Sequence, residues 1–118
     1  MSKKTGDKGE QIAADYLREK GYIILHVNWR YVHLELDIVA QHLNHLVVVE
    51  VKTGHTAVFG EPHEWVTRKK QKRVIKAADA YVQENNILTS TRFDIIAILL
   101  TLNGSEINHM VDAFSAVS

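Results

Sequence analysis

The stretch that decides the fold is LELDIVAQHLNHLVVVEVKT, residues 34–53. It contains two runs of β-forming residues, 34–41 and 45–53, on either side of a short polar turn that includes Asn44. A connection this short joins adjacent antiparallel strands. The sequence therefore predicts a β-hairpin.

Strand alternation gathers the charged side chains of this hairpin. In the first run Leu34, Leu36 and Ile38 alternate with Glu35, Asp37 and Val39, and in the second Val47, Val49 and Val51 alternate with Val48, Glu50 and Lys52. Successive side chains of a strand point to opposite faces. We therefore expect Asp37, Glu50 and Lys52 on one face, with Asp37 roughly opposite Glu50.

Two acids and a lysine that are partly buried are costly unless a cation offsets the negative charge. Carboxylate oxygens suit Mg²⁺ or Mn²⁺, and the backbone carbonyl of Val51 could add a further oxygen. Lys52 could then hold or deprotonate a bound water and stabilise charge on an attacked phosphate. A Glu-x-Lys triplet alone is more often an ordinary surface ion pair, so Asp37 across the hairpin is what favours a metal site.

A helix is predicted before the hairpin, from about Gly6 to Lys20. Its apolar residues Ile12, Ala13, Tyr16 and Leu17 have helical spacing, and Gly21 is placed to end it. Glu10 borders this apolar stripe, which could bring its carboxylate to the edge of the core. An acid in the first turn, favoured by the helix dipole, is the equally weighted alternative.

A second helix is predicted from about Trp65 to Gln83. Its apolar face consists of Val66, Val74, Ala77, Ala78 and Tyr81. Lys70 lies near the middle of that face, so it either extends out of the core to solvent or points at an anionic group. Residues 67–76 also include Arg68, Lys69, Lys72, Arg73 and Lys76 and contain no acid. This local positive charge could contact phosphates, although such a run is more often a solvated face.

The remaining runs complete an α/β architecture. A strand at 22–29 precedes the hairpin, and a loop is expected at 54–63. The segment 92–102, with a continuous apolar run at 95–100, indicates a central strand, and 106–114 adds an edge strand or hairpin partner. The order is helix, three-stranded antiparallel meander, helix, central strand and a weaker final strand. This order predicts helices packed on a mixed sheet.

Composition fits one soluble domain spanning residues 1–118. The apolar fraction is 46% and the charged fraction 24%, and no apolar run is long enough to span a membrane. The polar N-terminal ten residues lack the apolar segment of a secretory signal, so we expect a cytoplasmic protein. With 14 basic and 14 acidic residues, binding to a polyanion must depend on local charge or on help from a homodimer. The absence of cysteine excludes disulfides and thiolate metal sites.

The chain resembles the PD-(D/E)xK nuclease superfamily. Its members share a restriction-endonuclease-like core and include archaeal Holliday-junction resolvases. More closely, it resembles the YraN-like family of small predicted endonucleases. The matching pieces, over about positions 9–97, are Gly9-Glu10, Ala13, Tyr16-Leu17, Gly21-Tyr22, Asn28-Trp29-Arg30, residues 35–40, residues 49–53, Phe59-Gly60, Val66, Lys70-Gln71 and Arg92-Phe93-Asp94.

The resemblance implies a Mg²⁺- or Mn²⁺-dependent endonuclease. It implies Asp37 and Glu50 as metal ligands, Lys52 as the catalytic lysine, Glu10 as an auxiliary acid and Lys70 as a phosphate contact, to which we add Lys69 and Arg73 on the same helix. Two residues depart from the family pattern. Leu34 replaces a usual glycine, and Gly54 replaces a common basic residue, which removes one possible phosphate contact.

Several alternatives stay open. Glu35 is either a secondary member of the acidic cluster or a cross-strand partner of Arg30. The pairs His42 with His45 and His55 with His63 could suggest zinc, but neither has a third spaced ligand. Arg92 and Asp94 fit a structural ion pair, whereas Trp29, Trp65 and Tyr22 fit packing better than base stacking. Two functions follow: a nuclease acting on DNA, with branched or damaged forms among its candidate substrates, or a nucleic-acid-binding module that retains the fold without cleavage.

Overall fold

The computed structural model describes residues 3–55 and 65–116. Within them the chain forms α1 (Lys3–Glu19), β1 (Ile23–Tyr31), β2 (Leu34–His42), β3 (His45–Gly54), α3 (Arg68–Glu84), β4 (Ser90–Thr101) and β5 (Gly104–Phe114). Most of the loop expected at 54–63, and with it Phe59-Gly60 and His63, lies outside the described residues. The predicted order of helices and strands is confirmed.

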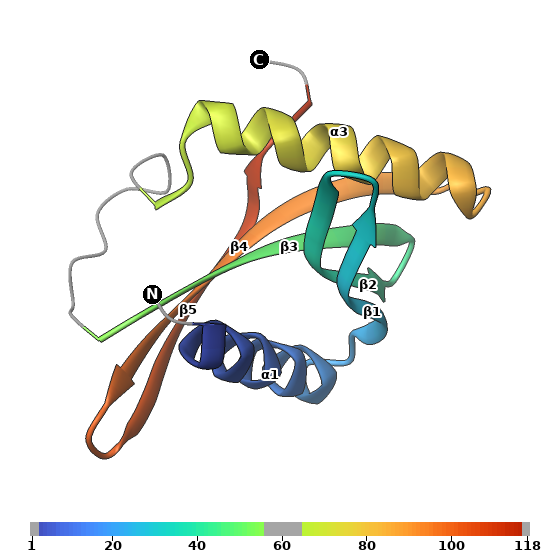
Figure 1. Cartoon of the computed structure of the whole chain (residues 1–118). Coiled ribbons are helices and arrows are strands. Elements are labelled where there is room, and N and C mark those ends of the chain that lie inside the picture. Colours follow the sequence, from blue (N-terminus) through green and yellow to red (C-terminus); the bar gives the residue numbers. More distant parts are fainter. Residues whose placement is uncertain (1–2, 56–64, 117–118) are drawn as a thin grey trace.

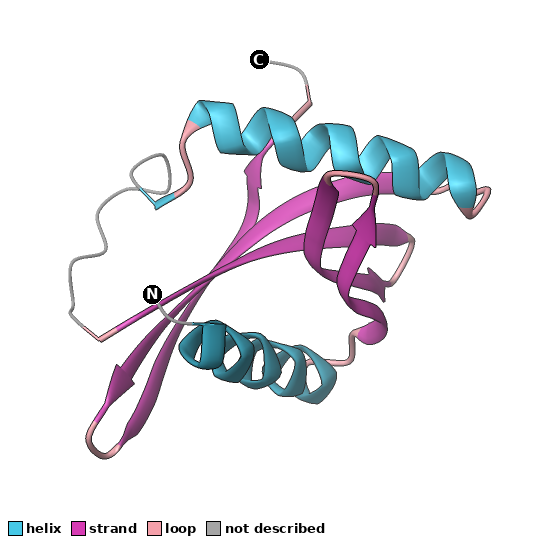
Figure 2. Cartoon of the chain, viewed as in Figure 1, coloured by secondary structure: helices cyan, strands magenta, loops and turns pink. Residues whose placement is uncertain are grey.

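One five-stranded sheet organises the molecule, in the order β1-β2-β3-β4-β5. The first three strands form the predicted antiparallel meander, β4 runs parallel to β3, and β5 returns antiparallel at the edge. Helices α1 and α3 lie on opposite faces of this sheet (Figure 1; Figure 2). This arrangement is an α/β fold with a mixed sheet, compatible with a restriction-endonuclease-like core. In the described residues, no helix has the length and apolar character required to cross a membrane.

Each helix covers its own hydrophobic core. The α1 side buries Ala13, Leu17, Ile38, Val49 and Ile96 among others. On the α3 side the core includes Leu36, Val48, Val74, Tyr81 and Ile95. Strands β3 and β4 contribute side chains to both cores. Their long apolar runs are therefore explained by burial of both strand faces.

Helix α1 begins before the position predicted from its apolar spacing and ends where Gly21 predicts. Gly21 adopts a φ of 90°, and the Tyr22 N–H donates to the Leu17 carbonyl at 3.0 Å. This left-handed glycine terminates the helix and turns the chain into β1.

Helix α3 starts at Arg68, later than the predicted Trp65, because Thr67 caps it. The Thr67 hydroxyl accepts a hydrogen bond from the Lys70 N–H at 3.2 Å. Val66 therefore precedes the helix, yet it is buried in the same core as Val74 and Tyr81. The predicted apolar face is correct in its residues, although one of them lies outside the helix.

The predicted strict alternation along β2 is wrong at Asp37. Leu36 belongs to the α3-side core, whereas Ile38, two residues on, belongs to the α1-side core. The physical reason lies in the neighbouring strand: the β1–β2 register passes from Val27–Ile38 to Trp29–Leu36 without pairing Asn28 and Asp37, and Asn28 has a left-handed φ of 58°. The strand therefore changes face at Asp37.

Candidate metal centre

Asp37 lies where β2 and β3 separate. Their pairing runs from His42–His45 to Ile38–Val49, so Asp37 and Glu50 are the next opposed positions, as predicted. The Asp37 carboxylate accepts a hydrogen bond from the Val51 N–H at 2.8 Å. In an extended strand the N–H and C=O of one residue point to the same side. The Val51 carbonyl therefore faces the gap that holds Asp37.

Glu50 is a buried carboxyl with few donors around it. It is only 6% exposed. Burial, followed by hydrogen bonding with Asp37 and the Asp37 charge, raises the pKa of Glu50 to about 9. Among the residues that the structure describes, the cation paired with it is the Lys70 ammonium, whose Nζ lies 3.9 Å from Glu50 Oε2. Asp37 and Glu50 thus form a close pair of carboxyl groups with insufficient positive charge.

Glu10, on α1, lies near enough to Asp37 for the Asp37 charge to affect its pKa. Burial, followed by the charges of Asp37, Asp7 and Glu35, raises the pKa of Glu10 to about 7 against a lowering effect of Arg30. The predicted approach of Glu10 to the core edge is therefore correct. Asp7, one helical turn earlier, is an additional nearby acid that the sequence analysis did not single out.

The basic residues differ in how closely they approach the acids. Lys52 is exposed, yet its charge lowers the pKa of Glu50, as does that of Lys70. Of the two orientations left open for Lys70, the structure has the one that points at an anionic group, because its ammonium contacts Glu50. Lys69 and Arg73 are exposed, and Arg73 lines a small recess with Lys70, His33 and Glu35. The centre thus has one inward-facing lysine and further cations at its rim.

Glu35 has the structural partner that one of its two interpretations predicted. It pairs with Arg30 across β1 and β2, and Arg30 Nε lies 3.7 Å from Glu35 Oε2. Both side chains are largely exposed, so this pair contributes little stability.

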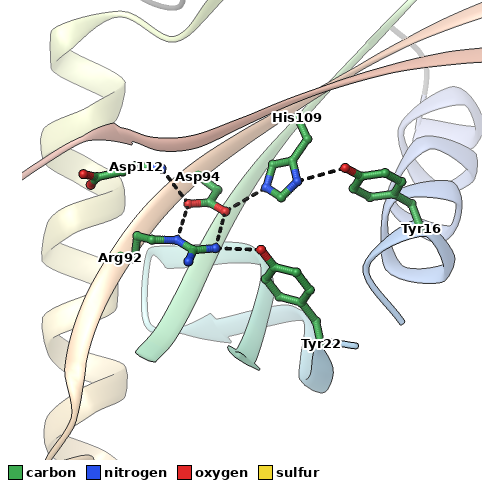
Figure 3. Close-up of polar contacts among 6 residues, drawn as sticks. All are labelled: Tyr16, Tyr22, Arg92, Asp94, His109 and Asp112. Atoms are coloured by element: carbon green, nitrogen blue, oxygen red, sulfur yellow. Dashed lines mark hydrogen bonds and ion pairs between the residues drawn. The ribbon is translucent and has the colours of Figure 1, made fainter. Parts of the chain in front are cut away.

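A second buried carboxyl, Asp94, lies in a complete hydrogen-bond network (Figure 3). Arg92 donates to both of its oxygens at 2.9 Å, the His109 Nε2 lies 2.7 Å from Oδ2, and the Asp112 N–H donates to Oδ1 at 2.9 Å. Arg92 also donates to the Tyr22 hydroxyl at 2.7 Å. The predicted Arg92–Asp94 ion pair is confirmed.

His42 and His45, the histidine pair that lies wholly within the described residues, both contact protein groups. His42 stacks on Tyr22 with ring centroids 3.9 Å apart, and His45 Nδ1 lies 2.8 Å from the Ser90 hydroxyl. Across residues 3–55 and 65–116, no three His, Asp or Glu side chains gather in a way that could hold a metal. The candidate centre therefore consists of two carboxyl groups and a backbone carbonyl.

The aromatic residues pack as predicted. Tyr22 is buried, and Trp29 packs edge-on against Tyr81 with ring centroids 5.2 Å apart. Trp65 is half-buried against the α3-side core.

Comparison with known proteins finds similar sequences over most of this chain. The model of the uncharacterised protein family UPF0102 matches residues 9–98, which include most of α1, the hairpin of β2 and β3, all of α3 and most of β4. A UPF0102 protein of Bacteroides thetaiotaomicron is 47% identical over 92% of this chain and 90% of its own length. One from Christiangramia forsetii is 45% identical over 92% of both chains. The chain therefore belongs to the UPF0102 family.

Proposed function

We propose that this protein is a Mg²⁺- or Mn²⁺-dependent endonuclease that hydrolyses phosphodiester bonds of DNA. The observation that carries the proposal is the buried Glu50 carboxyl beside Asp37. Two neighbouring carboxyl groups out of water are unfavourable unless a proton or a cation lies between them. A divalent cation supplies that charge.

The donors available at this point fit a hard cation. Asp37 and Glu50 offer carboxylate oxygens, and the Val51 carbonyl faces the same gap. Mg²⁺ usually takes one or two carboxylates and keeps several waters. A set of two carboxylates and one carbonyl therefore suits Mg²⁺ or Mn²⁺ and leaves positions for water and for a substrate oxygen.

The side chains around the centre have distinct tasks in this reaction. A bound divalent ion would activate water and polarise the phosphoryl group. The Val51 N–H orients the Asp37 carboxylate, and the Lys52 ammonium can stabilise negative charge that develops on the phosphate. Glu10, with a pKa of about 7, can accept or return a proton near neutral pH.

The first turns of α3 supply the positive charge that would hold the DNA backbone. Lys69, Lys70 and Arg73 contribute cations beside the centre, while the formal charge of the chain is zero. Phosphate contacts by Lys and Arg dominate nucleic-acid affinity. Branched or damaged DNA is the substrate class that such limited positive charge favours, because it can be selected by shape more than by overall charge.

A nucleic-acid-binding module without cleavage is the second candidate function. The observation that favours it is the position of Lys70, whose ammonium lies 3.9 Å from Glu50 and partly offsets the acids by itself. In that case the carboxyl pair stays protonated and binds no metal.

Metal binding and cleavage by the full chain separate the two functions. We expect wild-type protein to bind Mn²⁺ in calorimetry and to cleave at least one of linear, branched or single-stranded DNA. Asp37→Asn should abolish both while leaving DNA binding within about twofold, because it removes a metal ligand and no phosphate contact. A wild-type protein that cuts none of these DNA substrates, nor RNA, with Mg²⁺ or Mn²⁺ would support the binding module.

A further inference from the structure

At Gly9 the backbone of α1 lies close to β3. Gly9 is buried, and a Cβ atom added there would lie 1.9 Å from Thr53 Oγ1, 2.9 Å from Thr53 Cβ and 3.0 Å from Thr53 Cγ2. Ordinary van der Waals contact begins at 3.4 Å. Rotating the threonine side chain would move Oγ1 but not Cβ, so any side chain at position 9 forces the helix and β3 apart.

Gly6, on the same helix, shows that this closeness is specific. A Cβ added at Gly6 meets no atom within 4 Å. Glycine in a helix interior costs about 1 kcal/mol relative to alanine. The close approach of Thr53 explains why glycine occupies position 9 despite this cost, whereas no neighbouring atom requires glycine at position 6.

The two contacting residues are next in sequence to residues of the candidate centre. Thr53 follows Lys52 on β3, and Glu10 follows Gly9 on α1. Thr53 is 9% exposed, and its hydroxyl finds no hydrogen-bond partner within the described residues. A buried hydroxyl without a partner is unfavourable. The hydroxyl instead contacts the Gly9 backbone.

We infer that Gly9 and Thr53 are positioning residues: their contact sets the height of α1 above β3 and thereby holds the Glu10 carboxylate beside Asp37. The inference rests on the proposed function, because it assigns the contact to the assembly of that centre. A helix moves as a unit, so a displacement at Gly9 carries Glu10 with it. A displacement of about 1 Å at a catalytic group can reduce turnover about 100-fold.

Gly9→Ala, with Gly6→Ala as its matched control, tests this role. Both substitutions add the same methyl group to the same helix, and both should favour helix formation. We expect Gly9→Ala to lower kcat for DNA cleavage by about 10- to 100-fold, with DNA affinity unchanged, and Gly6→Ala to leave both within twofold. Equal activity of the two variants would overturn the inference.

Second-site variants separate positioning from a general loss of folding. Thr53→Gly removes all three contacting atoms and should restore activity to Gly9→Ala, whereas Thr53→Ser retains Oγ1 and Cβ and should not. Urea unfolding establishes that each variant is folded. Failure of Thr53→Gly to rescue a folded Gly9→Ala protein would count against the inference.

A metal-free measurement keeps the inference distinct from the proposed function. The coupling between Glu10 and Asp37 can be measured from the unfolding free energies of Glu10→Gln, Asp37→Asn and the double variant in chelator. We expect this coupling to fall by at least half in the Gly9→Ala background. If the coupling falls but wild-type protein binds no Mn²⁺, the positioning is correct and the nuclease proposal is wrong. If the coupling is unchanged, the positioning is wrong whatever the metal binding.

Discussion

Asp94 and Glu50 are buried carboxyl groups on adjacent strands, but their surroundings shift their pKa values in opposite directions. Asp94 is fully buried, and although burial alone raises its pKa, hydrogen bonds from His109, Arg92 and the Asp112 N–H hold that pKa below its usual value. Glu50 is almost as buried, but its closest neighbour is the Asp37 carboxyl, and its pKa is raised to about 9.

The difference shows that burial alone does not identify a functional acid. A carboxylate with enough donors is a structural element, because its charge is compensated within the fold. A carboxyl that faces another carboxyl and one distant lysine lacks that compensation. Such perturbed groups concentrate at functional sites. The comparison therefore assigns Asp94 to stability and supports the proposal that Glu50 binds a metal.

Removing the charge of Asp94 should have the largest effect on stability. We expect Asp94→Asn to lower the free energy of unfolding by about 3–5 kcal/mol, because Arg92, with a side chain only 16% exposed, loses its counter-charge. Urea unfolding followed by tryptophan fluorescence measures the loss. Asp79→Asn, an exposed change on α3, is the control and should stay within about 0.5 kcal/mol. A loss below about 1 kcal/mol for Asp94→Asn would remove the contrast between the two sites.

Replacing Glu50 with glutamine should change the free energy of unfolding in the opposite direction. In chelator at pH 7, we expect Glu50→Gln to raise the free energy of unfolding by about 1–3 kcal/mol, since glutamine avoids the cost of protonating a group that ionises in the unfolded chain. The same variant should lose Mn²⁺ binding. A clear destabilisation by Glu50→Gln would mean that Glu50 is a structural acid like Asp94.

The pH dependence of stability distinguishes the sites further. Because the folded-state pKa of Glu50 is raised from 4.5 to about 9, the folded protein binds the extra proton between these values, and stability falls as pH rises through that window. Glu10 adds to the fall between 4.5 and about 7. The lowered pKa of Asp94 acts in the other direction, and its contribution is lost only as pH falls below the ordinary value of 3.8.

Unfolding measured from pH 5 to pH 8 in chelator checks this prediction. The free energy of unfolding of the wild-type protein should decline with rising pH, and that of Glu50→Gln should decline less steeply. The difference between the two slopes should be up to about 1.4 kcal/mol per pH unit, the value for one proton. Saturating Mn²⁺ should reduce the decline in wild-type protein, because a cation replaces the proton. Parallel profiles for the two proteins would contradict the raised pKa of Glu50.

Local patterns in the sequence were sufficient to predict one of these two sites in outline. Strand period and a short turn place Asp37 opposite Glu50, and the helical wheel turns Lys70 inward. Both predictions depend on residues that are close in sequence or on one element. The face change at Asp37 could not be predicted, because it depends on the left-handed conformation of Asn28 in the neighbouring strand.

Of the hydrogen-bond network around Asp94, only the Arg92–Asp94 ion pair could be predicted from the sequence. Arg92 and Asp94 are two residues apart, so their contact follows from the strand itself. His109 and Tyr16 join the network from β5 and α1, with the Tyr16 hydroxyl 3.1 Å from His109 Nδ1. No local pattern indicates such contacts, since they exist only once the helix and the edge strand have docked.

Replacing Lys70 should have the smallest effect on stability. Glu50 is paired with a half-exposed lysine at 3.9 Å, whereas Asp94 is paired with a largely buried arginine at 2.9 Å. Lys70 Nζ lies 3.9 Å from Glu50 Oε2, and the lysine side chain is 38% exposed, so Lys70→Ala should change the free energy of unfolding by less than about 1 kcal/mol. Its effect should appear instead in DNA binding, as weaker affinity and a salt dependence reduced by about one phosphate contact. Lys72→Ala, on an exposed face of the same helix, is the matched control and should reduce the salt slope less. Titration of DNA at several salt concentrations measures both slopes. If Lys70→Ala leaves the salt slope unchanged, Lys70 only extends to solvent past the acids, and the positive charge beside Glu50 has no role in holding phosphate.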